Sequence, residues 1–169
     1  DGVSNSYFSL KALATSDGAL VGYSAFDPGG TFEGGFAKAD LNGDFEWDYA
    51  LNGVNDDDAE GYQAVATDDG GYILAGYVGS QMGNLKFGFH KINGQGQQIW
   101  SYNGPTTSSD IGAVDILATS TPSEYVFAGF EEGAVTSTGV VGFLQDTIAI
   151  TSIANYQNLS INIYPNPTA

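Results

Sequence analysis

Carboxylates supply most of the side chains in this sequence that could do chemistry. The densest group is Asn55, Asp56, Asp57 and Asp58, followed closely by Glu60. Oxygen ligands gathered in one loop can converge on Ca²⁺, which takes about six to eight of them in a flexible geometry. The alternative is a solvated loop in which Asp58 makes an Asx turn, and the recurrence of aspartate at position 110 favours that structural role. No cofactor is therefore expected, and Ca²⁺ in this loop is the alternative.

A second acidic stretch has the alternate spacing with which a calcium loop begins. Its residues are Asp40, Asn42 and Asp44, but no glutamate follows where the last ligand of such a loop would lie. Fifty-three residues later the stretch recurs with amides in place of the carboxylates. A hairpin turn therefore explains it better than a metal site. The amide residues are Asn93, Gln95 and Gln97.

Catalytic groups of other kinds are scarce. His90 is the only histidine, and it aligns with the apolar residues Ala37 and Leu144 of the other repeats, so a packed histidine is expected. No cysteine and no serine elbow offers it a triad partner. Paired carboxylates keep hydrolysis of polysaccharides open as an alternative. A sialidase-like site would need arginines, and the chain has none. We expect a protein that is not an enzyme, with no catalytic residues.

Charge and composition restrict the partners. Twenty acidic residues face four lysines, which gives a net charge of −16. Such a chain is repelled by nucleic-acid phosphates and by anionic lipid. No run reaches the length of a membrane span, so neither nucleic acid nor membrane insertion is expected. The 24 glycines, the 13% aromatic residues and the absence of any long helical pattern favour an all-β fold of short strands.

The stretch 62–77 shows the unit from which the chain is built. A short strand over 63–67 meets a turn of two aspartates and two glycines, which tolerate the positive φ angles of tight hairpins. The strand that follows, 72–77, is apolar at consecutive positions, which predicts that it is covered on both faces.

The unit occurs three times. Ala14, Ala66 and Ala118 recur every 52 residues. A glycine closes the second strand of each unit, which is expected where backbones lie close together. A phenylalanine is expected to open the third strand of each unit. The glycines are Gly22, Gly76 and Gly129, and the phenylalanines are Phe36, Phe89 and Phe143.

Tryptophans mark the fourth strand in the first two units. Trp47 and Trp100 are expected to be packing anchors between neighbouring units. The third unit lacks the tryptophan, as terminal repeats often depart from the pattern.

The predicted fold is all-β, with β-propeller-like blades of four strands in about three repeats of about 52–54 residues. Residues 1–150 form the repeats, with units at about 6–58, 59–110 and 111–150. Propellers need about four to eight blades, so three units predict either a partial, open array or one completed by further residues before Asp1 or by a partner, and completion is favoured.

The middle unit resembles a known bacterial repeat. Its Asp58, the run from Thr67 to Tyr77, Lys91 and the run from Trp100 to Gly104 are similar to a repeat of predicted propellers in secreted and surface proteins, many from Bacteroidetes. The resemblance covers about residues 6–145 and implies no particular enzyme activity.

The last residues carry a second resemblance. After a polar linker over 151–158, residues 159–169 are similar to the start of the C-terminal sorting domain of type IX secretion cargo, a hydrophobic strand that runs into Tyr-Pro-Asn-Pro. That resemblance implies export to the cell surface or the medium. Asp146-Thr147-Ile148 also resembles the O-glycosylation motif of Bacteroidetes, with Thr147 as acceptor.

These observations predict a secreted or cell-surface protein without catalytic activity that serves as a binding or adhesion module. Its partners would be glycans or other proteins, contacted by loops and by the aromatic residues Tyr23, Tyr77, Tyr102 and Phe130. Two alternatives stay open: a structural subunit of an extracellular assembly or filament, with self-association through strand edges, and a propeller enzyme that acts on polysaccharide.

Overall fold

The structure is a computed structural model that describes residues 6–26, 32–51, 58–80, 83–104, 109–132 and 137–146. Every regular element in these ranges is a β-strand, which confirms the all-β prediction. None of the described residues belongs to a helix long and apolar enough to cross a membrane.

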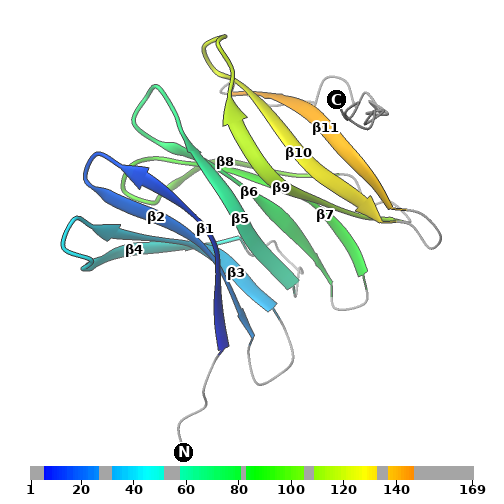
Figure 1. The fold of residues 1–169 in the computed structure, drawn as a ribbon, viewed down its shortest axis with the longest axis horizontal. Helices are drawn as coiled ribbons and strands as arrows, with labels where there is room; N and C mark the ends of the chain where they lie inside the picture. The colour runs from blue at the N-terminus through cyan, green and yellow to red at the C-terminus, as the bar shows by residue number, and fades with distance from the viewer. Residues whose placement is uncertain are drawn as a thin grey trace, which may run out of the picture.

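The strands form three antiparallel sheets that follow one another along the chain (Figure 1). The first and second sheets have four strands each and the third has three, and within each sheet the strands pair in sequence order. The first sheet contains β1 (Ser6–Thr15), β2 (Gly18–Phe26), β3 (Phe32–Asp40) and β4 (Phe45–Ala50). The second contains β5 (Asp58–Ala66), β6 (Tyr72–Ser80), β7 (Gly83–Ile92) and β8 (Gln98–Asn103). The third contains β9 (Asp110–Ala118), β10 (Glu124–Glu132) and β11 (Ser137–Gln145).

Glycines at positive φ make the tight turns. Gly70 has a φ of 80° between β5 and β6, where Thr67 and Gly71 join across the turn by a backbone hydrogen bond of 3.0 Å. Gly43 and Gly96, at φ of 86° and 77°, occupy the same place in the β3–β4 and β7–β8 turns. These are backbone conformations that a side chain disfavours, so the turn residues fix where each strand ends.

Stacking of the sheets buries two hydrophobic cores. We call the side of each sheet that faces the next sheet its forward face and the opposite side its backward face. Leu20 and Phe36 on the forward face of the first sheet pack with Leu74 and Ile92 on the backward face of the second. The second core joins Ile73, Ala75, Phe87 and Phe89, on the forward face of the second sheet, to the backward face of the third.

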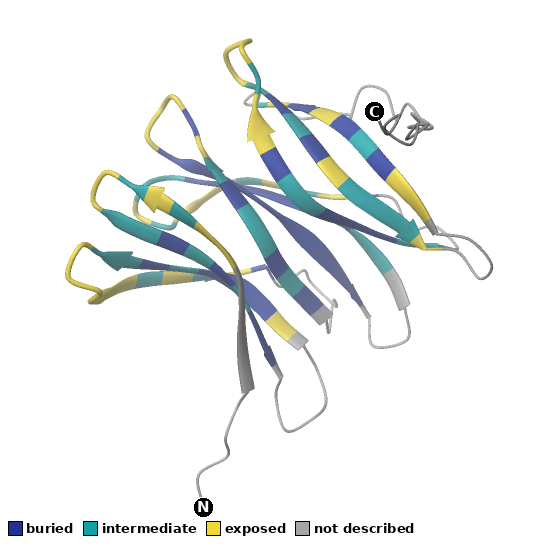
Figure 2. Cartoon of the chain, in the orientation of Figure 1, coloured by how far each residue is buried: buried dark blue, intermediate teal, exposed yellow. Residues whose placement is uncertain are grey.

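The second sheet therefore lies between the other two (Figure 2). Residues 72–79 of β6 are all buried, which confirms the prediction that this strand is covered on both faces. Burial on both sides explains why its sequence is continuously apolar instead of alternating.

Gly76 and Gly129 lie at equivalent β-bulges. On the N-terminal side of each glycine, the pairing with the preceding strand changes register. A Cβ at Gly76 would collide with the carbonyl oxygen of Glu60, and one at Gly129 with that of Gly112. Gly22 is equivalent to Ala75 and not to Gly76, because Gly22 pairs with Phe36 as Ala75 pairs with Phe89. A Cβ there would press on the carbonyl oxygen of Gly61 in the neighbouring sheet.

Phe143 does not occupy the position predicted for it. The third strands begin at Phe32, Gly83 and Ser137, before the aligned phenylalanines. Gly76 pairs with Gly88 and Gly129 pairs with Val140, so Phe143 stands where the second sheet has Lys91 and the first has Lys38. The alignment of His90 with Leu144 shifts likewise. One residue fewer between the bulge glycine and this strand in the third unit moves Phe143 to the forward face, where it is 50% exposed.

The first strands of the three sheets lie beside one another. β5 contacts both β1 and β9. Lys11 on β1 reaches past β5 to Asp115 on β9, with 2.8 Å between Nζ and Oδ2. The three sheets thus converge along their first strands and spread apart toward their outer strands, as Figure 1 shows.

Candidate ligand-binding site

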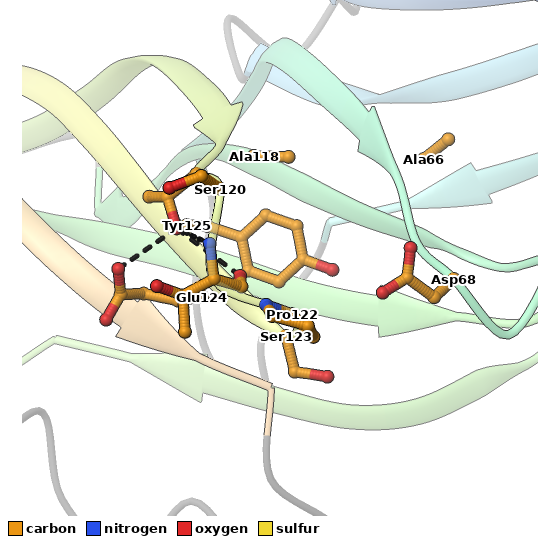
Figure 3. Close-up of a pocket in the computed structure, with 10 residues that line it drawn as sticks. Ala66, Asp68, Ala118, Ser120, Pro122, Ser123, Glu124 and Tyr125 are labelled. Atoms are coloured by element: carbon orange, nitrogen blue, oxygen red, sulfur yellow. Dashed lines mark hydrogen bonds between the residues drawn. The ribbon is translucent and has the colours of Figure 1, made fainter.

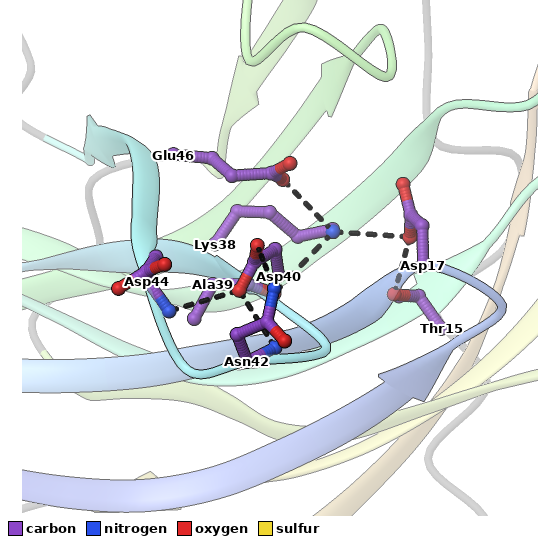
Figure 4. A network of polar contacts seen from close by, with 8 residues as sticks. All are labelled: Thr15, Asp17, Lys38, Ala39, Asp40, Asn42, Asp44 and Glu46. Carbon is purple, nitrogen blue, oxygen red and sulfur yellow. Dashed lines mark hydrogen bonds and ion pairs between the residues drawn. The ribbon is translucent and has the colours of Figure 1, made fainter.

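A buried lysine lies next to the β1–β2 turn (Figure 4). Lys38 is 1% exposed, and its Nζ lies 3.0 Å from both Asp17 in the turn and Glu46 on β4. Thr15 donates a hydrogen bond of 2.7 Å to the same Asp17 oxygen that the lysine contacts. An ammonium group out of water needs such acceptors, because an unpaired buried charge is costly.

The second sheet repeats this arrangement with one change. Lys91, also 1% exposed, lies 3.0 Å from Asp69 in the β5–β6 turn, and Thr67 donates to Asp69. Its second carboxylate, at 2.5 Å, is Asp146, which follows β11 in the third sheet. Trp100 Nε1 donates to the other Asp146 oxygen at 3.1 Å. The network therefore ties the second sheet to the third.

These contacts shift the ionisation of the turn residues. The hydrogen bond from Thr15, and after it the ammonium group of Lys38, lower the pKa of Asp17. Thr67, and after it Lys91, lower the pKa of Asp69. Burial disfavours the charged form of Lys38, but its bonds to the two carboxylates outweigh this and raise its pKa. The turns therefore keep their charges at neutral pH.

The tryptophans lie opposite the lysines. Trp47 pairs with Lys38, and Trp100 pairs with Lys91, in the strand register. The Trp47 ring packs 6.4 Å from that of Tyr72 in the second sheet, between ring centroids, and a Cβ on Gly96 would press against it. Both tryptophans are half-buried at a junction between sheets.

His90 is buried between the first and second sheets. Its Nδ1 lies 2.8 Å from the hydroxyl of Tyr49, and its Nε2 has no hydrogen-bond partner among the described residues. Burial lowers the pKa of His90 to about 4 and raises that of Tyr49 to about 12. The imidazole is thus neutral at physiological pH.

A pocket of about 430 Å³ opens between the β1–β2 and β5–β6 turns. Ser16, Asp17 and Thr67 line it with hydroxyl and carboxylate groups, Tyr72 adds an aromatic ring and Gln95 an amide. The side chain of Gln95 is exposed. The pocket thus offers hydrogen-bond donors and acceptors together with an anionic group.

A smaller pocket of about 200 Å³ lies at the matching place between the second and third sheets (Figure 3). It is lined by Asp68 from one turn and by Ser120, Ser123 and Glu124 from the other, with Tyr125 between them. Tyr72 is the first buried residue of β6, and Tyr125 is the first buried residue of β10. Burial raises the pKa of Tyr125 to about 12. The same turn edge thus carries a pocket at each junction.

The residues predicted to bind calcium lie largely outside the part of the chain that the structure describes, so the calcium site stays a prediction. Asn55, Asp56 and Asp57 lie outside the described residues, and of Asp58 only the backbone, at the start of β5, is described. Thr147 and residues 151–169 also lie outside them. Within the described ranges no three histidine or acidic side chains are grouped so that they could hold a metal ion. Asp110 accepts a hydrogen bond of 3.0 Å from the amide of Leu85.

The Asp40 stretch forms a turn. The Oδ1 of Asp40 accepts hydrogen bonds from the backbone amides of Asn42 and Asp44, at 2.8 and 2.9 Å. Asn93 accepts equivalent bonds from the amides of Gln95 and Gln97. An amide oxygen accepts the same backbone hydrogen bonds as the carboxylate oxygen. The turn therefore requires a hydrogen-bond acceptor at this position and not a negative charge, as the hairpin interpretation expects.

Sequence reasoning missed the buried lysines and the turn pockets. Lys38 and Lys91 were visible as a recurring charged residue, two positions after a phenylalanine and thus on the same strand face. That spacing is a usable signal, because a lysine on an apolar face needs acidic partners nearby. The aromatics expected to contact ligands differ in exposure: Tyr77 is buried, while Tyr23, Tyr102 and Phe130 are half-buried.

No protein-family model and no curated protein sequence matches this chain.

Proposed function

We propose that the chain is a secreted or cell-surface protein without catalytic activity that binds glycans through the pockets along its turn edge. The observation that carries this proposal is the pocket between the β1–β2 and β5–β6 turns, with its counterpart at the next junction. A site repeated at successive junctions suits a ligand with repeating units.

The chemistry of the pocket favours an uncharged, hydroxyl-rich ligand. Ser16 and Gln95 can donate and accept hydrogen bonds, whereas Asp17 and Thr67, whose hydroxyl proton is donated to Asp69, can only accept them. With a net charge of −16 the chain repels anionic ligands.

The arrangement of the sheets supports a propeller-like array. The sheets follow one another in chain order, stack face to face and converge along their first strands. In the propeller interpretation, each sheet is one blade and the first strands line the centre. The turn edge is then one end of the array, which is where a surface for binding is accessible.

Export is the second part of the proposal. It is supported by the resemblance of residues 159–169 to a type IX sorting domain, and by the resemblance of the repeats to those of secreted and surface proteins. O-glycosylation at Thr147 belongs to the same proposal. Secretion from a type IX-competent host, with the mass of the secreted protein measured, tests both.

A glycan array probed with the full chain tests the ligand class. Glycans that bind would then be titrated calorimetrically against the Gln95→Ala variant, which shortens an exposed side chain in the pocket. We expect affinity to fall about tenfold, as for the loss of one or two hydrogen bonds, with the melting temperature unchanged.

Asn42→Ala is the matched control. Asn42 occupies the position of Gln95 in the β3–β4 turn of the first sheet and does not line the pocket. It should bind like the original chain. If no glycan binds, the ligand class is wrong, and if Gln95→Ala and Asn42→Ala bind alike, the site is not this pocket.

A structural subunit of an extracellular assembly is the second candidate function. It is favoured by the exposed apolar residues Leu117 and Phe143 on the forward face of the third sheet, which no other described residues cover.

A further inference from the structure

The forward face of the third sheet is apolar and exposed. Leu117 is 58% exposed and Phe143 50%. Val126, half-buried, lies between them on β10, and Val141, also half-buried, precedes Phe143 by two residues on β11. Counting from the bulge glycines, Val126 matches Ile73 and Val141 matches Phe89, both of which are 0% exposed. The third sheet thus presents the same positions that the second sheet buries.

The backward face of the first sheet is the counterpart at the other end. Val21, Ala37 and Ala39 on this face are half-buried. They match Leu74, His90 and Ile92, which the second sheet buries against the first. A hollow of about 470 Å³ lies on this face, lined by Ala37 together with Tyr23 and Phe45.

We propose that these two faces bind each other between two copies of the chain: the forward face of the third sheet in one copy packs on the backward face of the first sheet in the other. The described residues make this kind of junction twice, and no other described sheet packs on the forward face of the third sheet or on the backward face of the first. The inference rests on the second candidate function and is independent of glycan binding.

The side chains at the two faces complement each other in size. Lys38 and Lys91 need carboxylate partners at the internal junctions, whereas Phe143 at the matching position needs none. The first sheet carries Ala19 and Ala39 where the second has the larger Tyr72 and Ile92. The smaller residues leave room for the ring of Phe143.

The number of sheets points to a dimer. Sheets arranged as propeller blades close into rings of about four to eight. The described residues of one copy form three sheets, so two copies supply a number in that range. A head-to-tail contact that closes in this way gives a finite ring instead of a filament.

Light scattering coupled to size exclusion tests the proposal on the full chain. We expect a mass twice the 17.6 kDa of one chain, which decreases on dilution. Phe143→Asp and Ala37→Asp each place a charge on one face and should weaken association at least about 100-fold, because the contact would bury an unpaired carboxylate. Leu41→Asp is the control: it makes the same charge change at a 77% exposed position in the β3–β4 turn, and should remain dimeric.

Mixing the two variants gives the decisive arm. Phe143→Asp retains an intact first sheet and Ala37→Asp an intact third sheet, so the mixture should form heterodimers through this one intact junction, at concentrations at which each variant alone is monomeric. Monomeric original chain at all concentrations would overturn both the inference and the second candidate function. An association that the two face substitutions leave unchanged would overturn the inference alone and point to strand edges.

Discussion

At the scale of single residues, the hydrogen bonds around His90 determine its tautomer. The hydroxyl of Tyr49 has one proton and lies against both the Nδ1 of His90 and the Oε1 of Gln98. All three groups are satisfied only if Tyr49 donates to Gln98 and His90 donates from Nδ1 to the Tyr49 oxygen. Nε2 is then an acceptor, and protonating it would place a charge between two packed sheets.

His90 should make the protein less stable in mild acid. Its pKa is about 4 in the folded chain and 6.5 without burial, so the unfolded chain binds the extra proton first as the pH falls. Stability is then lost between about pH 6.5 and pH 4, by about 2 kcal/mol at pH 5 relative to pH 7.5. Urea unfolding at the two pH values measures this difference.

His90→Gln isolates the contribution of the imidazole, because glutamine does not titrate. The variant should lose most of the stability difference between pH 7.5 and pH 5. An unchanged difference would mean that the carboxylates, and not His90, control stability in this range.

Lys91 and Asp146 should depend on each other. The side chain of Asp146 is 16% exposed, whereas the partners of Lys38, Asp17 and Glu46, are 66% and 39% exposed. Lys91→Met would leave a largely buried carboxylate without its cation, so we expect a loss of about 3 kcal/mol in unfolding free energy. Lys38→Met should cost less, since water can solvate its former partners.

A double-mutant cycle with Asp146→Asn measures the coupling directly. The double variant should be more stable than Lys91→Met, because the unpaired charge is gone. Additive losses would show that the two residues contribute independently and that the ion pair does not hold the third sheet on the second.

At the scale of elements, local sequence patterns predicted strand burial and turns but did not predict the register in which strands pair. The sequence of β6 shows its burial directly, because each residue from Tyr72 to Gly79 is small or apolar. Turn chemistry likewise predicted the hairpin at Gly70. The position of Phe143 could not be derived, since one residue more or less before a strand reverses the face of every side chain that follows. The pairing that reveals the shift comes from strands far apart in sequence.

Alanine at the bulge glycines should be strongly destabilising. A Cβ at Gly76 would collide with the backbone of β5, and one at Gly129 with the backbone of β9, and neither backbone can move without breaking its sheet. We expect each substitution to cost about 3 kcal/mol or more, measured by chemical unfolding.

Gly139→Ala on β11 is the comparison, because no atom lies within 4 Å of the added Cβ and the φ angle is ordinary. It should be neutral or stabilise by about 0.5 kcal/mol. Equal losses at Gly76 and Gly139 would attribute the effect to strand propensity instead of close backbone approach.

At the scale of the whole molecule, stability should be distributed unevenly among the sheets. The second sheet contributes to both hydrophobic cores, whereas the first and third contribute to one each. β6 and β7 also pair with a strand on each side. Which sheet faces are covered depends on contacts between units about fifty residues apart, so the repeat pattern alone gave three similar units with no order of stability.

Amide hydrogen exchange should reveal this order. We expect β6 and β7 to exchange slowest, because their amides open only when both junctions separate. β4 should exchange faster by at least about tenfold, because it lies at the edge of an outer sheet.

The measurement uses Phe143→Asp, in which the proposed contact between copies is removed. β11 lies at the edge of the third sheet and should exchange rapidly in that variant. It should exchange more slowly in the original chain at high concentration, where the proposed contact forms. Protection of β11 equal to that of β6 in Phe143→Asp would mean that the outer sheets do not open before the central one, and that the three sheets unfold as a single unit.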